Sequence, residues 1–161
     1  MLQLFKPLPI VHEVHRLDTL PEAARRRPRD TITLGWEERL KVRGRRRSDG
    51  GVEFATTLPR ATLLRDGDCF ILPDLLVMVV ERGERVFVIE PRTAAEWGLF
   101  AYHIGNSHQP LMITERGLIC ADVIGMRQVL EYHRIPFTRA ERPFTPVGFN
   151  PGHQHIPADR G

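Results

Sequence analysis

The rhythm of apolar and polar positions changes at about residue 31. Residues 1–30 are interrupted by prolines and show little periodicity, so we expect an irregular arm there. From Thr31 apolar and polar residues alternate, a period of two that predicts strands with one buried face. The apolar members are Ile32 and Leu34, then Leu40 and Val42, then Val52 and Phe54. Short strands at this spacing indicate a small all-β domain.

Two turn signals divide these strands. Asp49-Gly50-Gly51 predicts a hairpin, because Asp-Gly sequences tolerate the positive φ values of a tight turn. A second strand pair is expected around Asp66-Gly67-Asp68, with strands at residues 63–64 and 69–72. Both turns favour a β-rich N-terminal half.

Beyond the apolar strand predicted at residues 75–80, the rhythm alternates between strand and helix. Arg82-Gly83-Glu84 closes that strand, so we expect a first domain of residues 1–82 and a second of residues 83–143. The predicted order in the second is strand, helix, strand, strand, helix, strand, which is the ferredoxin-like βαββαβ arrangement. The fold class is therefore α+β.

Two helices are expected in the second domain. The first starts at Thr93, where Thr93 and Glu96 form a capping box, and ends at Gly105-Asn106, which tolerates a left-handed conformation. The second starts at Asp122, a favourable N-cap. The residues predicted to be buried are Ala94, Trp97, Ala101 and Ile104 in the first helix, and Val123, Met126 and Leu130 in the second. A final strand is expected at residues 135–140, and residues 144–161, rich in proline and glycine, as a flexible tail with His153 and His155.

Composition adds the cellular setting and excludes some functions. No apolar run is long enough to span a bilayer, and Pro7 and Pro9 interrupt the segment where a signal peptide would need apolar residues. We therefore expect a cytoplasmic protein with no membrane partner. Cys69 and Cys120 lie far apart in apolar runs, which predicts buried, reduced thiols.

Charge gives no sign of nucleic-acid binding. The net charge is +3, and the clusters at residues 25–27 and 45–47 consist of arginine. Acidic residues are nearly as numerous, and neither cluster contains the aromatic residues on which bases stack. We interpret both clusters as solvated loops and expect no nucleic-acid partner.

Histidines are the candidate chemical groups. His103 and His108 lie five residues apart on either side of Gly105-Asn106, so His108 should occupy a corner between helix and strand. Imidazole is the commonest protein ligand for borderline transition ions, although a lone histidine at a helix end more often caps the last carbonyls. No His-Glu-x-x-His element occurs, so a metal-dependent hydrolase is not favoured and we expect no enzyme activity.

Several motifs match those of one protein family. In the N-terminal half they are Trp36-Glu37-Glu38-Arg39, the arginine run before Ser48-Asp49-Gly50, and residues 58–68. In the C-terminal half they are residues 101–108, which contain Gly-Asn-Ser-His, residues 143–146, and a short histidine-bearing tail. Together they resemble the UreE-type urease accessory proteins, a family of nickel metallochaperones.

The resemblance implies a homodimer joined through the second domain, with a partner-binding first domain. It implies that His108 binds Ni²⁺ at the dimer interface and that His103 and Asn106 have at most a supporting role around the site. We expect His153 and His155, on the flexible tail, to add nitrogen ligands. It also implies delivery of Ni²⁺ to the urease apoprotein complex through a UreG-type GTPase. Zn²⁺ or Cu²⁺ could substitute, because nitrogen ligands suit all three ions.

The chain also departs from the family pattern. Ser107 replaces a common arginine, and Asp122 and Ile124 stand where some relatives have extra histidines, so an auxiliary nickel store is not expected there. Two alternative functions stay open on the sequence: a general Zn²⁺ or Cu²⁺ buffer, and, less favoured, an RNA-binding module. The second would require an aromatic-rich RNA-recognition motif that the predicted strands lack.

Overall fold

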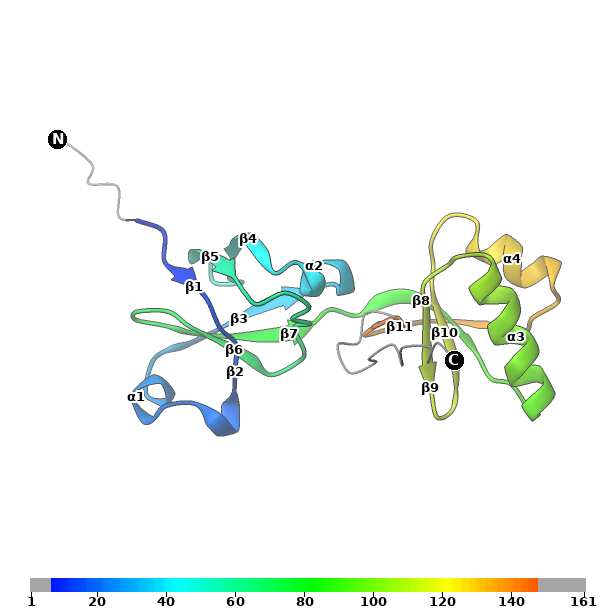
Figure 1. Ribbon diagram of the computed structural model, residues 1–161, viewed down its shortest axis with the longest axis horizontal. Coiled ribbons are helices and arrows are strands. Elements are labelled where there is room, and N and C mark those ends of the chain that lie inside the picture. The colour runs from blue at the N-terminus through cyan, green and yellow to red at the C-terminus, as the bar shows by residue number, and fades with distance from the viewer. Residues whose placement is uncertain (1–6, 148–161) are drawn as a thin grey trace, which may run out of the picture. The chain divides into compact units, whose positions relative to one another are not determined.

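The structure is a computed structural model that describes residues 7–147. The chain divides into two compact units, residues 1–82 and residues 83–161 (Figure 1). No helix among residues 7–147 is long and apolar enough to cross a membrane. The two-unit organisation combines mostly β-strands with a few helices, in agreement with the α+β class.

The first unit contains two separate sheets, one of three strands and one of four. One has the order β1 (Ile10–Val11), β5 (Glu53–Thr57) and β4 (Arg43–Arg47); the other has the order β2 (His15–Arg16), β6 (Asp68–Ile71), β7 (Leu76–Glu81) and β3 (Arg29–Leu34). Three short helical segments accompany them: η1 (Leu17–Thr19), α1 (Glu22–Arg25) and α2 (Trp36–Leu40).

Side chains from both sheets form the core of this unit. Ile32 and Leu34 lie on the buried face of β3, which confirms the predicted alternation, and Phe54 and Phe70 contact across the core with ring centroids 5.5 Å apart. The hairpin at residues 49–51 is also confirmed, since β4 and β5 pair antiparallel on either side of it.

Three predictions for the first unit are wrong. Leu40 ends helix α2 (Trp36–Leu40), although Leu40 and Val42 were predicted to lie on one strand. The helix forms because Gly35 starts a short turn in which the Glu38 carboxylate accepts the Gly35 N–H. Residues 63–64 are not a strand; β6 begins at Asp68 and pairs with β7. The N-terminal arm is not wholly irregular, since it contains β1, β2 and α1. These elements are too short for periodicity to reveal.

The second unit follows the predicted order of elements. It consists of β8 (Glu84–Ile89), α3 (Ala94–Asn106), β9 (Leu111–Thr114), β10 (Gly117–Ala121), α4 (Met126–Tyr132) and β11 (Thr138–Arg142). The strands form one antiparallel sheet in the order β11-β8-β10-β9, and both helices lie on the same face of it (Figure 1).

The helices are held by an apolar core against the sheet. Phe100 and Ile104 of α3 and Met126 and Leu130 of α4 are buried against residues of β8 and β10. Thr93 caps α3 by accepting the Glu96 N–H, as predicted. Phe100 was absent from the predicted stripe, and Ala94 is exposed, so the buried face of α3 begins one turn later than expected.

Helix α4 begins later than predicted. Gly125, with a φ of +88°, is its N-cap, while the N–H of Asp122 donates to the carbonyl of Arg85 and continues the sheet pairing. Val123 is 42% exposed rather than buried. Asp122 therefore continues the backbone pairing just beyond the end of β10 at Ala121 instead of starting the helix.

Both cysteines and the segment after β11 are well packed. Cys69 and Cys120 are buried free thiols, as expected.

Phe144 is fully buried, and the Val147 N–H donates to the carbonyl of Leu111 at 2.7 Å. Residues 144–147 thus belong to the second unit, and the predicted tail cannot start at residue 144.

We predict that Asp49→Asn lowers the free energy of unfolding by about 1 kcal/mol at pH 7. The Asp49 carboxylate accepts hydrogen bonds from the hydroxyls of Thr31 and Thr33, and the Thr31 hydroxyl is the main cause that lowers the pKa of Asp49. Because the unfolded pKa, about 3.9, is higher, this stabilisation is complete above that value and is lost as pH falls through the lowered folded pKa.

Urea unfolding of both proteins between pH 7 and pH 3 measures the effect, and the difference should shrink below about pH 4. Asp74→Asn is the matched control, because Asp74 is exposed and no hydrogen bond to its side chain occurs among residues 7–147. An Asp49→Asn difference that stays constant down to pH 3 would contradict the assignment.

Candidate metal site

The corner between α3 and β9 is closed by local hydrogen bonds. Ser107 is the C-cap of α3, and its N–H donates to the carbonyls of His103 and Ile104, both at 3.2 Å. The Ser107 hydroxyl also donates to the Ile104 carbonyl at 2.6 Å, and the His108 N–H donates to the Gly105 carbonyl at 3.0 Å. The last turn of the helix is therefore satisfied without any imidazole nitrogen.

His108 itself reverses the chain. Its φ is +56°, in the left-handed region that non-glycine residues seldom adopt. The sequence had placed this conformation at Gly105-Asn106, and that prediction is wrong, because both residues remain helical. A strained backbone position held by neighbouring hydrogen bonds fixes the direction in which His108 leaves the helix.

The imidazole of His108 is available to a ligand. His108 is exposed, and its ring makes no hydrogen bond with any of residues 7–147. Within the same residues, no group of three His, Cys, Asp or Glu side chains lies close enough to hold an ion. The described part of one chain therefore offers a single fixed nitrogen here, which is less than a transition ion requires.

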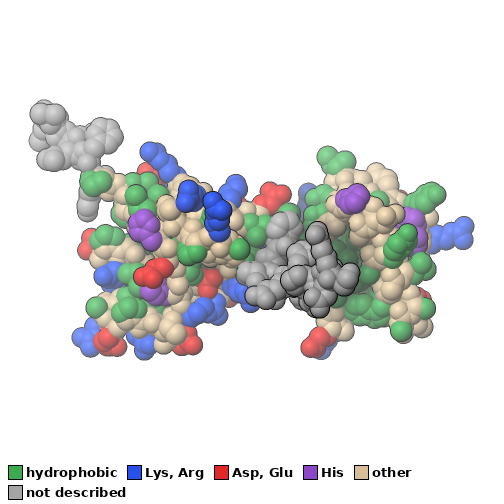
Figure 2. Space-filling model, in the orientation of Figure 1, with side chains coloured by type: hydrophobic (Ala, Val, Ile, Leu, Met, Phe, Trp, Pro, Cys, Tyr) green, Lys and Arg blue, Asp and Glu red, His purple; other side chains and the backbone are tan. Residues whose placement is uncertain are grey.

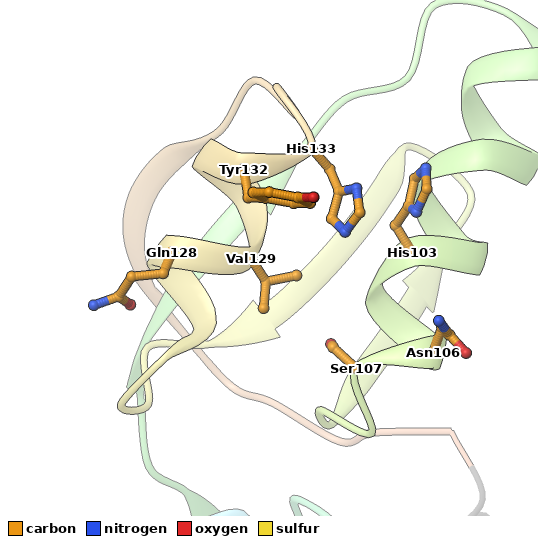
Figure 3. A pocket seen from close by; sticks show the side chains of 7 residues that line it. All are labelled: His103, Asn106, Ser107, Gln128, Val129, Tyr132 and His133. Atoms are coloured by element: carbon orange, nitrogen blue, oxygen red, sulfur yellow. The ribbon is translucent and has the colours of Figure 1, made fainter.

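His103 and Asn106 lie on the last turns of α3. The His103 ring stacks on that of His133 at the end of α4, with centroids 3.8 Å apart, and Asn106 lines the same surface pocket (Figure 3). No pattern in the sequence connects His103 with His133. Thirty residues separate them, and the pairing follows from the packing of α3 beside α4.

The tail histidines, His153 and His155, lie outside the described residues. Val147, the last described residue before them, lies near the corner, since its N–H donates to the carbonyl of Leu111, three residues after His108. Other histidines belong to the first unit: His12 is exposed, and His15 lies 3.2 Å from the Glu13 carboxylate. Figure 2 shows histidine side chains at the surface of both units.

Two family profiles match the chain, one for each unit. Residues 9–81 match the N-terminal domain of the UreE urease accessory protein, and residues 84–160 match its C-terminal domain. The chain belongs to the UreE family of urease accessory proteins. Such proteins are accessory to an enzyme, which agrees with the expectation that this chain is not itself one.

Individual UreE relatives are moderately similar. The chain is 34% identical over 128 residues to a urease accessory protein UreE of Burkholderia thailandensis, a match covering 78% of this chain and 60% of the relative. It is 38% identical over 98 residues to that of Paraburkholderia xenovorans, covering 60% and 43% respectively. With the protein of Parasynechococcus marenigrum it is 35% identical over 129 residues, covering 77% and 85%. The first two relatives thus extend well beyond the matched region.

We predict that His108→Gly is more stable than His108→Ala by about 1 kcal/mol in metal-free buffer, because only glycine adopts positive φ without strain. Denaturant unfolding in the presence of a chelator measures the difference. At Asn106, which is helical, the order should reverse, with Asn106→Ala the more stable variant. Equal stability of the two His108 variants would show that the corner relaxes.

Proposed function

We propose that this UreE-family chain is a nickel metallochaperone that carries Ni²⁺ for assembly of the urease active site. The observation that supports it most is His108, an exposed imidazole with no hydrogen-bond partner in residues 7–147, set on a strained corner. Family membership supplies the urease context, and the ligand chemistry supplies the means of holding a borderline ion.

A homodimer completes the site. A two-fold axis brings the same residue of each chain to one place, so two copies of His108 supply two nitrogens to one ion. Such a site exists where two chains meet and needs further ligands to hold the ion firmly. Carrier function favours this arrangement, because ligands that leave one at a time let the ion be passed on.

The tail is within reach to supply those ligands. His153 lies six residues after Val147, and six residues of extended chain span about 20 Å. The Val147 N–H donates to the carbonyl of Leu111, which lies three residues after His108 in the sequence. We propose that His153 and His155 add nitrogens to the ion held by His108.

The fold supports a division of roles between the units. The order β11-β8-β10-β9, with two helices on one face, matches the ferredoxin-like arrangement that we propose as the dimerisation and metal-binding domain. We assign partner binding to residues 1–82, with a UreG-type GTPase and the urease apoprotein complex as partners in the cytoplasm. Exposed arginines of β4 offer a basic surface for such contacts.

The donor set leaves the choice of ion broad. Imidazole nitrogens suit Ni²⁺, Cu²⁺ and Zn²⁺, and Cu²⁺ binds most tightly in the usual order of affinities. Nickel is therefore proposed from the family. A urease-activation assay with the GTPase present separates a nickel chaperone from a Zn²⁺ or Cu²⁺ buffer, because only the chaperone should activate urease.

We predict that His108→Gly weakens Ni²⁺ binding by more than about tenfold in calorimetry of the purified dimer. Glycine is chosen because it removes the imidazole while keeping the left-handed backbone. Light scattering should show that the dimer persists, and urease activation should fall in parallel. His12→Gly, in the first unit, is the control. Unchanged tight binding in His108→Gly would overturn the proposed site.

For the tail, we predict that His153→Ala/His155→Ala weakens Ni²⁺ binding less than His108→Gly does and changes the ligand-field spectrum of bound nickel. The reason is that two nitrogens are lost from an ion still held by both copies of His108. Absorption spectroscopy of the nickel-loaded protein measures the change. A double variant with wild-type affinity and spectrum would show that the tail takes no part.

A further inference from the structure

The His103 and His133 rings form a face-to-face pair at the surface of the second unit. Their centroids are 3.8 Å apart and their planes differ by 18°. His103 lies on the last turn of α3, and His133 is the C-cap of α4. Figure 3 shows the two rings facing each other beside the ring of Tyr132, with nitrogens at their edges. The pair borders an open pocket of about 350 Å³.

We propose that His103 and His133 form a second binding site for a borderline divalent transition ion, contained within a single chain. It deepens the proposed function, because it adds a holding point for the same class of cargo. It differs from the interface site in needing no second chain, since both histidines belong to the same compact unit. Asp122 and Ile124 take no part in it.

A shared ion requires a definite spacing between its two nitrogens. Two nitrogens bound to one ion at about 2.1 Å, with a right angle between them, lie about 3 Å apart. The 3.8 Å of the stack separates the ring centroids, so the two imidazoles are in contact, and both rings must turn before two nitrogens reach that spacing. In a stack, however, the nitrogen lone pairs lie in nearly parallel planes, so the ion must bind at the edge of the pair and not between the rings.

The rearrangement needed is a rotation of each ring about its bond to the Cβ atom. That torsion has a broad energy minimum, so the lone pairs can converge at low cost. Both side chains are half-buried, and the pocket is open to solvent beside them, which leaves room for the ion and its water. The backbone of each helix end is held by its own hydrogen bonds and need not move.

The surroundings favour a weakly held, exchangeable ion. Among residues 7–147 no third His, Cys, Asp or Glu joins the pair, so the protein supplies two nitrogens. Asn106 and Gln128 also line the pocket, which is open to solvent, so water can supply the remaining ligands. His103 also lies at the C-terminal end of α3, where the helix dipole favours a cation.

The competing explanation is that the stack serves packing alone, by joining α3 to α4. Phenylalanine separates the two, because it keeps an aromatic ring in contact and removes both nitrogens. We therefore choose His103→Phe and His133→Phe, each made in a full-length chain that carries His108→Gly, His153→Ala and His155→Ala. That background removes the interface and tail ligands, so the remaining binding reports on the pair.

The measurements are calorimetry with Cu²⁺ and imidazole-nitrogen NMR with Zn²⁺. The background protein should bind one Cu²⁺ per chain, and Zn²⁺ should shift the ring signals of His103 and His133 together. Each phenylalanine substitution should weaken Cu²⁺ binding at least about tenfold and abolish the paired shift, while His12→Phe should change neither. The NMR titration needs no change at the pair, so it decides the matter even if a phenylalanine variant fails to fold.

Ring signals of His103 and His133 that stay in place during the Zn²⁺ titration would overturn the proposal. So would Cu²⁺ binding that is unchanged by His133→Phe. These outcomes are separate from failure of the interface site, which is tested by Ni²⁺ binding to the His108→Gly variant with the pair intact. The two proposed sites are therefore tested independently, and failure of one does not contradict the other.

Discussion

The chain must turn from α3 into β9 within four residues, and this constraint determines most of what the second unit presents to a ligand. The turn is made by His108 in a left-handed conformation. Ser107 stabilises it by donating hydrogen bonds to the carbonyls of His103 and Ile104 in the last turn of the helix. Histidine seldom adopts this conformation, and His108 is held in it by several hydrogen bonds, each contributing about 1 kcal/mol. The side chain is left free because the backbone and Ser107 do the capping.

The sheet and its core fix where the helix ends lie. Buried residues such as Phe100, Ile104 and Leu130 hold α3 and α4 against β8 and β10, so the two helices end beside each other. The stacked rings of His103 and His133 are a consequence of that packing. The same unit therefore carries both the corner and the ring pair on one rigid support.

The sequence predicted the elements with strong periodicity and missed those decided by tertiary contacts. Alternation was enough to place β3 and the β4–β5 hairpin, and a capping pair was enough to place the start of α3. Asp122 looked like an N-cap, but its N–H is used by the Arg85 carbonyl in the sheet. His108 could be singled out from its motif, whereas its left-handed backbone and the pairing of His103 with His133 depend on contacts that no local pattern encodes.

The arginine run of the first unit is a strand and not the loop that its charge suggested. In the part of the chain that the structure describes, β4 is the outermost strand of its sheet, so one row of its backbone groups has no strand beside it. Arg43, Arg45 and Arg47 are exposed along it. Their like charges oppose the approach of the same edge of another copy, which guards against uncontrolled strand-to-strand aggregation.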